Sequence, residues 1–239
     1  MQEVAEYLHL TEADVERLLE NEEIPSEERG GRVVFRKQLI DAWATQRILG
    51  LEDRPLTEYH QKTSRGTRTV LENEAIMPEM IRPEYIAAAM AAKTKASALR
   101  EMVALAEKTG KVLDSKDLLA SLEAREELCS TALPGGLALL HPRHHDPYMF
   151  DASFIVLGRP VQDIFYGAPD GQPTHLFFLI CCQDDRIHLH TLARLCMMAV
   201  KTGLLDELRQ AADGGAMYDC LVAAEQEVLA DKKAMPRGS

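Results

Sequence analysis

The sequence predicts an α/β protein preceded by a small, mainly helical N-terminal domain. Within the first 50 residues, apolar positions recur at helical spacing in short runs. From Ile76 onward, short apolar runs alternate with longer amphipathic segments, as strands alternate with helices in α/β folds. The run HLFFLICC, residues 175–182, is apolar almost throughout, which suits a central strand covered by helices on both faces.

The N-terminal region begins with two predicted short helices. Val4 and Leu8 share one face of the first helix. Thr11, with Asp14 three residues later, forms the capping pattern that starts the second helix. A tight corner at residues 9–10 joins the two helices, so this region is predicted to form a helix-turn-helix.

A hairpin and a third helix are predicted to follow. The glycine pair at residues 30–31 precedes the β-prone run 33–37, which predicts a small wing. Residues 38–48 then return to helical spacing. The apolar side chains expected to dock this third helix are Leu39, Ile40 and Trp43.

The charge of the N-terminal region disfavours a strong DNA interface. Its 50 residues hold 11 acidic and 6 basic side chains, a net charge of −5, and the predicted second helix is strongly acidic. Because those carboxylates would face phosphates, any DNA contact is expected to be local and weak. A protein-docking role is an equal alternative. The basic candidates for DNA contact are Arg17, Arg29, Arg32, Arg36 and Lys37.

Composition limits the classes of protein to consider. The 239 residues carry a formal net charge of −11, which argues against general polyanion binding. The five cysteines are odd in number and form no C-x-x-C pair, so neither a disulfide framework nor a zinc knuckle is indicated. Without a charged-then-apolar leader or an apolar run of roughly 18 residues, we expect a soluble, cytoplasmic protein that does not contact a membrane.

Changes in composition predict four segments. Residues 1–50 form the helical domain, and residues 51–75 are rich in Gly, Pro, Thr and Ser, as expected of a linker. Residues 76–230 form the α/β domain, and residues 231–239 form a polar, frayed tail. The strands predicted in the α/β domain are 85–90, 137–140, 154–157 and 174–182. The predicted helices are 93–108, 114–128 with Leu118, Leu119, Leu122 and Leu128 inward, 187–200, 204–212 and 216–229.

Residues 125–143, REELCSTALPGGLALLHPR, hold the best candidate for chemistry. The apolar strand in this run delivers His141 at its end. An imidazole there is well placed to hold a phosphoryl group, with Gly135–Gly136 letting the backbone approach and with Arg125 and Arg143 supplying charge. The alternative is a structural histidine at the end of a strand.

This run resembles the active-site segment of the enzyme IIA proteins of the phosphotransferase system, in their fructose, mannitol and nitrogen-regulatory branch. The shared pattern is REx(3)ST followed by A-x-x-H-x-R. Residues 167–180, GAPDGQPTHLFFLI, and the His188-Leu189-x-x-Leu192 run resemble two further motifs of the family, in the same order. The resemblance implies a mixed β-sheet sandwiched by helices. Residues 1–50 resemble the excisionase-like branch of the MerR helix-turn-helix domains.

The enzyme IIA resemblance also implies roles for four residues. His141 would be the nucleophile that receives the phosphoryl group, and His188 the second active-site histidine. Arg125 would lie near the phosphoryl group, and Thr131, with its neighbour Ser130, would offer hydroxyl hydrogen bonds. The non-functional alternatives are a solvated helix charge for Arg125 and, for Ser130, Thr131 and His188, a role in ending or capping a helix. The site would need no cofactor.

The resemblance further implies partners. A phosphocarrier protein (HPr-like or NPr-like) would donate the phosphoryl group, and a IIB component or a regulatory target protein would receive it. Leu140 departs from the family by replacing the usual proline before the histidine, and Ala132 and Pro134 alter the glycine-rich approach. A regulator phosphorylated slowly or not at all therefore stays open. The alternative function is a DNA-binding transcriptional regulator whose IIA-like domain is a non-catalytic sensor.

A cluster of histidines raises the possibility of a metal site. No carboxylate stands at H-E-x-x-H spacing, and adjacent side chains on a strand point apart, so no metal is expected. The histidines concerned are His141, His144, His145, His188 and His190.

Overall fold

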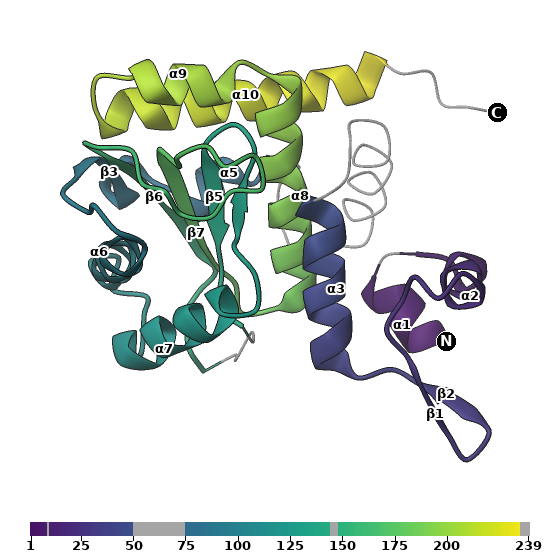
Figure 1. Cartoon of the computed structure of the whole chain (residues 1–239). Coiled ribbons are helices and arrows are strands. Elements are labelled where there is room, and N and C mark those ends of the chain that lie inside the picture. The colour runs from purple at the N-terminus through teal and green to yellow at the C-terminus, as the bar shows by residue number, and fades with distance from the viewer. Residues whose placement is uncertain (9, 50–74, 144–147, 235–239) are drawn as a thin grey trace.

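A computed structural model describes residues 1–8, 10–49, 75–143 and 148–234 of the chain. The predicted linker lies outside the described residues except for residue 75, as does His9 of the predicted corner. The N-terminal elements are α1 (Gln2–Tyr7), α2 (Glu12–Glu20), β1 (Glu27–Arg29), β2 (Arg32–Val34) and α3 (Lys37–Leu49). Their order is that of a winged helix-turn-helix, with β1 and β2 forming the hairpin (Figure 1).

The predicted start of the second helix is confirmed by its hydrogen bonds. The Asp14 amide donates to the Thr11 hydroxyl at 3.1 Å, and the Thr11 amide donates to the Asp14 carboxylate at the same distance. This reciprocal pair satisfies two donors that the first turn of a helix otherwise leaves without partners. The first two helices bury Ala5, Leu8, Val15 and Leu18.

Helix α3 packs through Ile40, as predicted, but not through Leu39. Ile40, Ala44 and Ile48 are buried and recur every four residues, so they share one stripe of the helix. Leu39 falls outside that stripe and is exposed, which corrects its predicted place in the core. Trp43 is partly buried, and its indole donates to the Glu23 carbonyl at 2.6 Å.

The second domain is built on a five-stranded mixed sheet, as predicted, in the order β3-β6-β7-β5-β4. Strand β7 is central: it pairs parallel with β5 and antiparallel with β6. Strands β3 and β6 are parallel, and the short edge strand β4 is antiparallel to β5. The strands are β3 (Ile86–Met90), β4 (Ala132–Leu133), β5 (Leu137–Leu140), β6 (Phe154–Pro160) and β7 (Leu176–Cys181).

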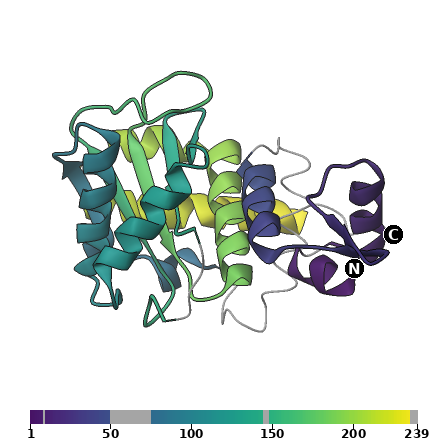
Figure 2. The ribbon, with the colours of Figure 1, turned by 60° about the horizontal axis from the view of Figure 1, so that its bottom comes forward.

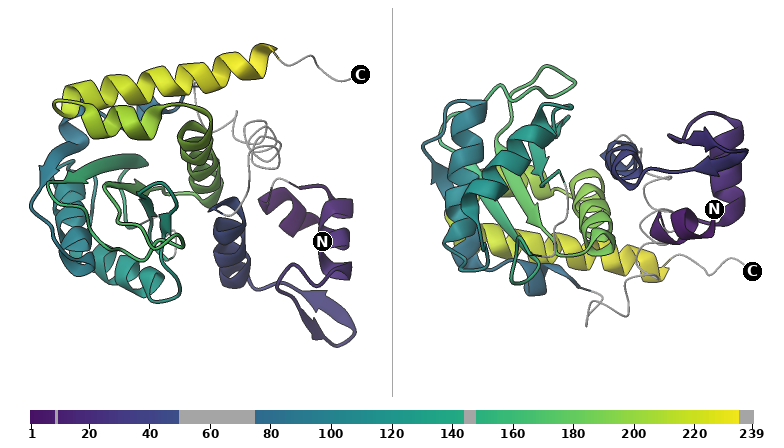
Figure 3. Two further views of the ribbon diagram at one scale, coloured as in Figure 1. Left: turned by 45° about the horizontal axis from the view of Figure 1, so that its top comes forward. Right: turned by 90° about the horizontal axis from the view of Figure 1, so that it is seen from below.

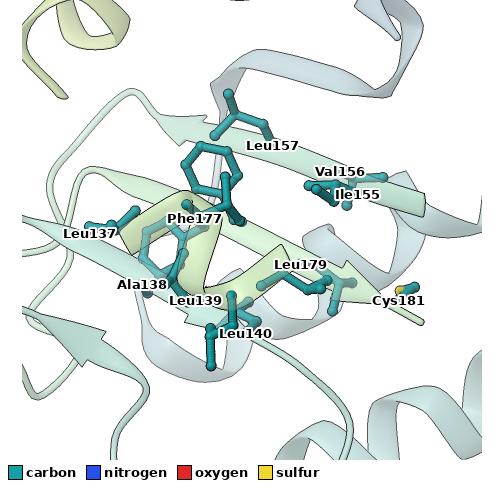
Figure 4. Close-up of a cluster of buried hydrophobic side chains, with 14 of the residues drawn as sticks. Leu137, Ala138, Leu139, Leu140, Ile155, Val156, Leu157, Phe177, Leu179 and Cys181 are labelled. Atoms are coloured by element: carbon teal, nitrogen blue, oxygen red, sulfur yellow. The ribbon is translucent and has the colours of Figure 1, made fainter. Parts of the chain in front are cut away.

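Helices cover both faces of the sheet. Helices α6 and α7 lie on one side, and α8, α9 and α10 lie on the other (Figures 1 and 2). Apolar side chains from β5, β6 and β7 fill the space between, and every residue of β5 and β7 is buried (Figure 4). The helices are α5 (Met77–Met80), α6 (Lys95–Glu107), α7 (Ser115–Glu126), α8 (Asp185–Lys201), α9 (Leu204–Gln210) and α10 (Gly214–Ala234), with a short 3-10 helix η1 (Pro83–Tyr85).

Several boundaries differ from the predicted ones. Helix α7 ends at Glu126, so Leu128 lies beyond it and is exposed rather than inward. Helix α10 continues to Ala234, four residues into the segment expected to fray. Strand β4, α5 and η1 are too short to give a periodic signal in the sequence. Within the described residues, no helix is both long enough and apolar enough to span a membrane.

A buried ion pair ties three parts of the second domain together. Arg194 of α8 and Glu225 of α10 lie 2.5 Å apart, with 0% and 1% of their side chains exposed. The Glu225 carboxylate also accepts the backbone amides of Ile76 and Met77, each at 2.9 Å. The start of the α/β domain is thus fastened to α8 and α10 through one carboxylate.

This arrangement predicts a large stability loss for Glu225→Ala. The change leaves Arg194 as a buried charge and strips two amides of their acceptor, so we expect the free energy of unfolding to fall by about 3–5 kcal/mol. Chemical denaturation measures it. Glu227→Ala removes an exposed carboxylate from the same helix and should change stability by less than about 0.5 kcal/mol. Equal losses of stability in the two variants would contradict the inferred role of the Arg194–Glu225 ion pair.

Candidate active site

The topology brings four chain segments to one edge of the sheet. Strands β5 and β7 are parallel, so their carboxyl ends share this edge. His141 follows β5 directly, and α8 begins four residues after β7 ends. Strand β4 runs antiparallel to β5, so its amino end, reached from α7, lies at the same edge. The residues between α7 and β4 therefore meet His141 and the first turns of α8.

The hydrogen bonds of His141 determine its tautomer. The Arg125 Nε–H, which can only donate, lies 2.9 Å from His141 Nε2. Nε2 therefore accepts, and the ring hydrogen is on Nδ1, which lies 2.9 Å from the Leu139 carbonyl. The hydrogen bond at Nδ1 fixes the ring and leaves the lone pair at Nε2 as the nucleophilic position.

Arg125 is a buried cation in the last turn of α7, with 4% of its surface exposed. Its Nη1 donates to the Cys129 carbonyl at 3.1 Å and contacts the Cys129 sulfur at 3.3 Å. Its Nη2 is buried and has no hydrogen-bond partner among the described residues. No carboxylate of the described chain forms an ion pair with this guanidinium. A buried guanidinium without an anion is costly, so the site is suited to receive one.

His188 lies next to His141, as the predicted pairing of the two histidines requires. The ring centroids are 4.9 Å apart and the ring planes are tilted by 45°. His188 belongs to the first turns of α8, whose N-cap Asp184 accepts the amides of Arg186 and Ile187. The positive end of the helix dipole thus lies on the side of the paired imidazoles.

Thr131 contacts a different partner from the one the resemblance implies. Its hydroxyl and its amide both donate to the Glu126 carboxylate. Glu126 is buried and forms an ion pair with Lys95 at 2.8 Å, and Lys95 lies over the ring of Tyr166. Burial and the Glu126 carboxylate raise the pKa of Tyr166, so its phenol stays protonated. Thr131 thereby binds the carboxylate of Glu126, the residue that follows Arg125 in the chain.

Glu126 and Lys95 were missed as site residues, although the sequence offers a signal for each. Glu126 lies in the last turn of α7, where the helix dipole disfavours an anion. Lys95 lies in the first turn of α6, where the helix dipole disfavours a cation. A charge on the wrong end of a helix needs another partner. Here the two charges pair with each other across α6 and α7.

Other residues of the active-site segment lie away from His141. Gly135 and Gly136 form the turn between β4 and β5 at the opposite end of β5, so they do not line the approach to the ring. Both adopt positive φ, and a side chain on Gly136 would collide with His175. The Arg143 side chain is exposed, and the Ser130 hydroxyl donates to the Tyr166 carbonyl at 3.3 Å.

The paired imidazoles are enclosed. His141 has 3% and His188 has 2% of its surface exposed. A phosphoryl donor must bring its phosphorus in line with Nε2 at about 3 Å. As described, neither ring is open to a protein donor.

The described cysteines are mostly buried thiols. Cys181, Cys182 and Cys196 are buried, and burial raises the pKa of Cys196 to about 12, so it stays a thiol. No group of three potential metal ligands occurs among the described residues. His144 and His145 of the histidine cluster lie outside them. His190 is buried within α8.

Most of the candidate DNA-contacting residues are paired with carboxylates. Arg17 binds Asp14 at 3.0 Å, and Arg29 and Arg36 both bind Glu27, at 3.0 and 2.6 Å. Glu27 is held by two cations, and these bonds lower the pKa of its carboxyl against the effect of desolvation. Lys37 binds Asp185 of α8 at 2.6 Å. Arg32 is exposed, and no ion pair of it is seen within the described residues.

Comparison with known families identifies the α/β part. A family model described as phosphoenolpyruvate-dependent sugar phosphotransferase system, EIIA 2, matches residues 79–223, more than half of the chain. The chain belongs to this family. A second model, described as a helix-turn-helix domain, matches residues 1–48 of this EIIA 2 protein. Both resemblances seen in the sequence are thereby confirmed.

Two curated relatives of this EIIA 2 protein carry PTS and nitrogen-regulatory names. The PTS system fructose-specific EIIABC component of Bacillus subtilis is 27% identical over 145 residues, which is 60% of this chain and 22% of that protein. The nitrogen regulatory protein of Pseudomonas aeruginosa is 29% identical over 111 residues, 46% of this chain and 70% of that protein. The chain thus matches about a fifth of the length of the Bacillus relative.

Solved structures show the same fold. The nitrogen regulatory protein IIA-Ntr from Neisseria meningitidis aligns with a TM-score of 0.56 at 24% identity, covering 62% of this chain and 99% of that one. The mannitol IIA protein from Escherichia coli aligns with a TM-score of 0.53 at 18% identity, covering 59% and 98%. The likeness extends over nearly the whole of both structures and leaves the helix-turn-helix as an addition in this chain.

The hydrogen bonds of His141 predict its tautomer in solution. We expect nitrogen-15 NMR to show a neutral ring with hydrogen on Nδ1 and a bare Nε2, because Arg125 occupies Nε2 as a donor. Arg125→Ala removes that donor and should shift the Nε2 resonance while the Nδ1 hydrogen bond persists. A ring that carries its hydrogen on Nε2 would contradict the described geometry.

Proposed function

We propose that this EIIA 2 protein accepts a phosphoryl group on Nε2 of His141 and serves as a phosphocarrier with a regulatory role. The observation that supports this most directly is Arg125. Its guanidinium is buried, donates to the proposed nucleophile and keeps a buried Nη2 without a partner among the described residues. A phosphoryl group on Nε2 supplies the anion that this cation lacks.

The transfer needs no proton to move. The lone pair of His141 Nε2 attacks phosphorus, the nitrogen–phosphorus bond to the donor imidazole breaks, and the donor leaves with the bonding pair. The hydrogen on Nδ1 stays in place, where the Leu139 carbonyl stabilises the positive charge that develops on the ring. Arg125 must release Nε2 before attack, and its guanidinium then binds the phosphoryl oxygens.

His188 completes the proposed cradle from the other side. Its ring is close enough to His141 for a hydrogen bond to a phosphoryl oxygen placed between the two imidazoles. The first turn of α8 adds the favourable end of the helix dipole. Thr131 acts one step further out, because it binds the Glu126 carboxylate that lies beside Arg125.

The proposed partners are proteins that carry phosphohistidine. A phosphocarrier protein is the donor, and a IIB component or a regulatory target receives the phosphoryl group or responds to it. The E. coli mannitol IIA protein, which shares this fold, has been solved in complex with phosphorylated IIB. Because the chain adds a helix-turn-helix domain and matches a nitrogen regulatory protein, we favour a regulatory role over sugar transport.

The central prediction concerns labelling from phosphoenolpyruvate through enzyme I and the phosphocarrier protein. Wild type should acquire an acid-labile phosphohistidine at residue 141, and His141→Ala should acquire none. Arg125→Ala should slow labelling by about 10²–10³-fold, the usual effect of losing one donor to a developing oxyanion. Mass spectrometry locates the modification, and radiolabelled phosphate gives the rate.

Two control variants sharpen this test. His175→Asn changes a histidine at the far end of the sheet and should leave labelling unchanged, and Arg125→Lys keeps the charge but loses the Nε donor. Undiminished labelling of His141→Ala would refute the assignment of the acceptor.

The alternative function is a DNA-binding regulator with a non-catalytic IIA-like domain, favoured by the helix-turn-helix match. It requires cations free to meet phosphates, whereas Arg17, Arg29 and Arg36 are engaged with carboxylates. We therefore expect no sequence-selective retardation of duplex DNA in a mobility-shift assay at about 0.15 M salt. The alternative would be established by two results together. The protein would retard duplex DNA selectively, with Arg32→Ala abolishing this effect, and it would not be phosphorylated.

A further inference from the structure

The third helix of the helix-turn-helix domain lies along the helix that carries His188. Helices α3 and α8 lie side by side and in contact, and both start at the same end of the pair (Figure 1); Figure 3 shows them adjacent from two further directions. Helix α8 belongs to the EIIA 2 domain and α3 to the added domain. Their contact is therefore where the two domains of the chain meet among the described residues.

One charged contact fixes the register of the two helices. Lys37 Nζ lies 2.6 Å from the Asp185 carboxylate, so the first residue of α3 meets the first residue of α8. The Asp185 side chain is only 13% exposed, whereas Lys37 is 66% exposed. The carboxylate is thus largely covered, and the lysine reaches it from solvent.

Buried apolar residues share the Lys37 side of α3. Lys37, Ile40, Ala44 and Ile48 follow the spacing of three, four and four residues that places side chains on one face of a helix. The last three of these residues are buried, and α3 as a whole packs against α8. Helix α3 therefore meets the EIIA 2 domain with its charged first residue and with part of its packed length.

Helix α8 is buried around its whole circumference over residues 187–198. A helix packed on one layer leaves one side in water, so full burial requires cover from more than one direction. The covering elements are β7, α9 and α10 of its own domain and α3 of the added domain. The docked helix-turn-helix is thus part of the packing that holds α8 in place.

The beginning of α8 couples this docking to the proposed phosphoryl site. Asp185 and His188 are three residues apart, which makes them neighbours on the helix surface. His188 in turn lies against His141, and both rings are almost fully enclosed. The contacts run from Lys37 through Asp185 and His188 to the proposed nucleophile.

We infer that the helix-turn-helix domain is an intramolecular cover for the phosphoryl site: docked on α8 through α3, it holds the His141–His188 pair closed, and its release opens the pair. This inference rests on the proposed function for its biological meaning, because the guarded residue is the proposed acceptor. Its physical content is the accessibility of the two imidazoles. That accessibility can be measured without any phosphoryl donor.

Docking and phosphorylation affect each other in both directions, because the two equilibria are linked. If docking disfavours the phosphorylated site, then phosphorylation disfavours docking by the same factor. A phosphoryl group brings about two negative charges and several atoms into a space that the docked form leaves closed. Phosphorylation would then release α3, and the freed Lys37 and the part of α3 that packs on α8 would be offered to a partner.

The test compares three variants of the full-length chain. Lys37→Glu places a carboxylate against Asp185, and the double variant Lys37→Glu with Asp185→Lys restores opposite charges. Lys108→Glu, at an exposed position after α6, makes the same change in net charge away from the contact. Far-UV circular dichroism checks that each variant folds.

Two readouts separate the inference from the proposed function. The first is the rate at which diethyl pyrocarbonate acylates His141 and His188, followed by mass spectrometry. The second is the rate of phosphohistidine labelling. We expect Lys37→Glu to raise both rates roughly threefold to fivefold, the double variant to return toward wild type, and Lys108→Glu to leave both unchanged.

The acylation and labelling rates together decide between three outcomes. Acylation of Lys37→Glu at the rate of wild type would overturn the inference, whatever the labelling shows. Acylation that rises while labelling stays at the wild-type rate would overturn the claim that docking limits phosphorylation. Acylation that rises in a protein labelled in no variant would support the cover and overturn the proposed phosphoryl transfer.

Discussion

The hydrogen bond from Arg125 to His141 is the interaction on which the rest of the site depends. It sets the tautomer of the imidazole, because a guanidinium can only donate. It also keeps a cation in the interior with one nitrogen, Nη2, unsatisfied among the described residues. The unsatisfied buried cation is unfavourable by itself and becomes favourable once an oxyanion binds it. The neighbouring Glu126 is already neutralised by Lys95, so it does not compete for the guanidinium.

The sheet supplies the rigidity that this geometry requires. Strands β5 and β7 are buried throughout, and their parallel pairing places His141 and α8 at one edge by topology alone. Helix α8, by contrast, packs against both domains of the chain. The proposed acceptor thus follows a strand of the sheet, and the proposed control acts through a helix that two domains share. Within the helix-turn-helix, Arg17, Arg29 and Arg36 pair with carboxylates of the same domain, whereas Lys37 pairs with Asp185 of α8.

Local signals in the sequence were sufficient to predict the fold and to predict that His141 and His188 lie together. The capping box at Thr11, the wholly apolar run of β7 and the order of the motifs all act through near neighbours, so a linear reading recovers them. The closed state of the site, the partner of Thr131 and the contact between Lys37 and Asp185 depend on segments far apart in the chain. The glycine pair illustrates the same limit: Gly135 and Gly136 were predicted to let the backbone approach the phosphoryl group, but the strand direction places their turn at the end of β5 opposite His141.

The Arg194–Glu225 clamp has a consequence for how the two domains find each other. It fastens the backbone at Ile76 and Met77 to α8 and α10, while α3 ends at Leu49 beside the same α8. Both ends of the connecting stretch are thus held next to α8. The local concentration of one domain around the other is then set by the chain that joins them and not by the concentration of the protein. Dilution therefore leaves the docking equilibrium unchanged, whereas salt, a change at the contact or a competing protein shifts it.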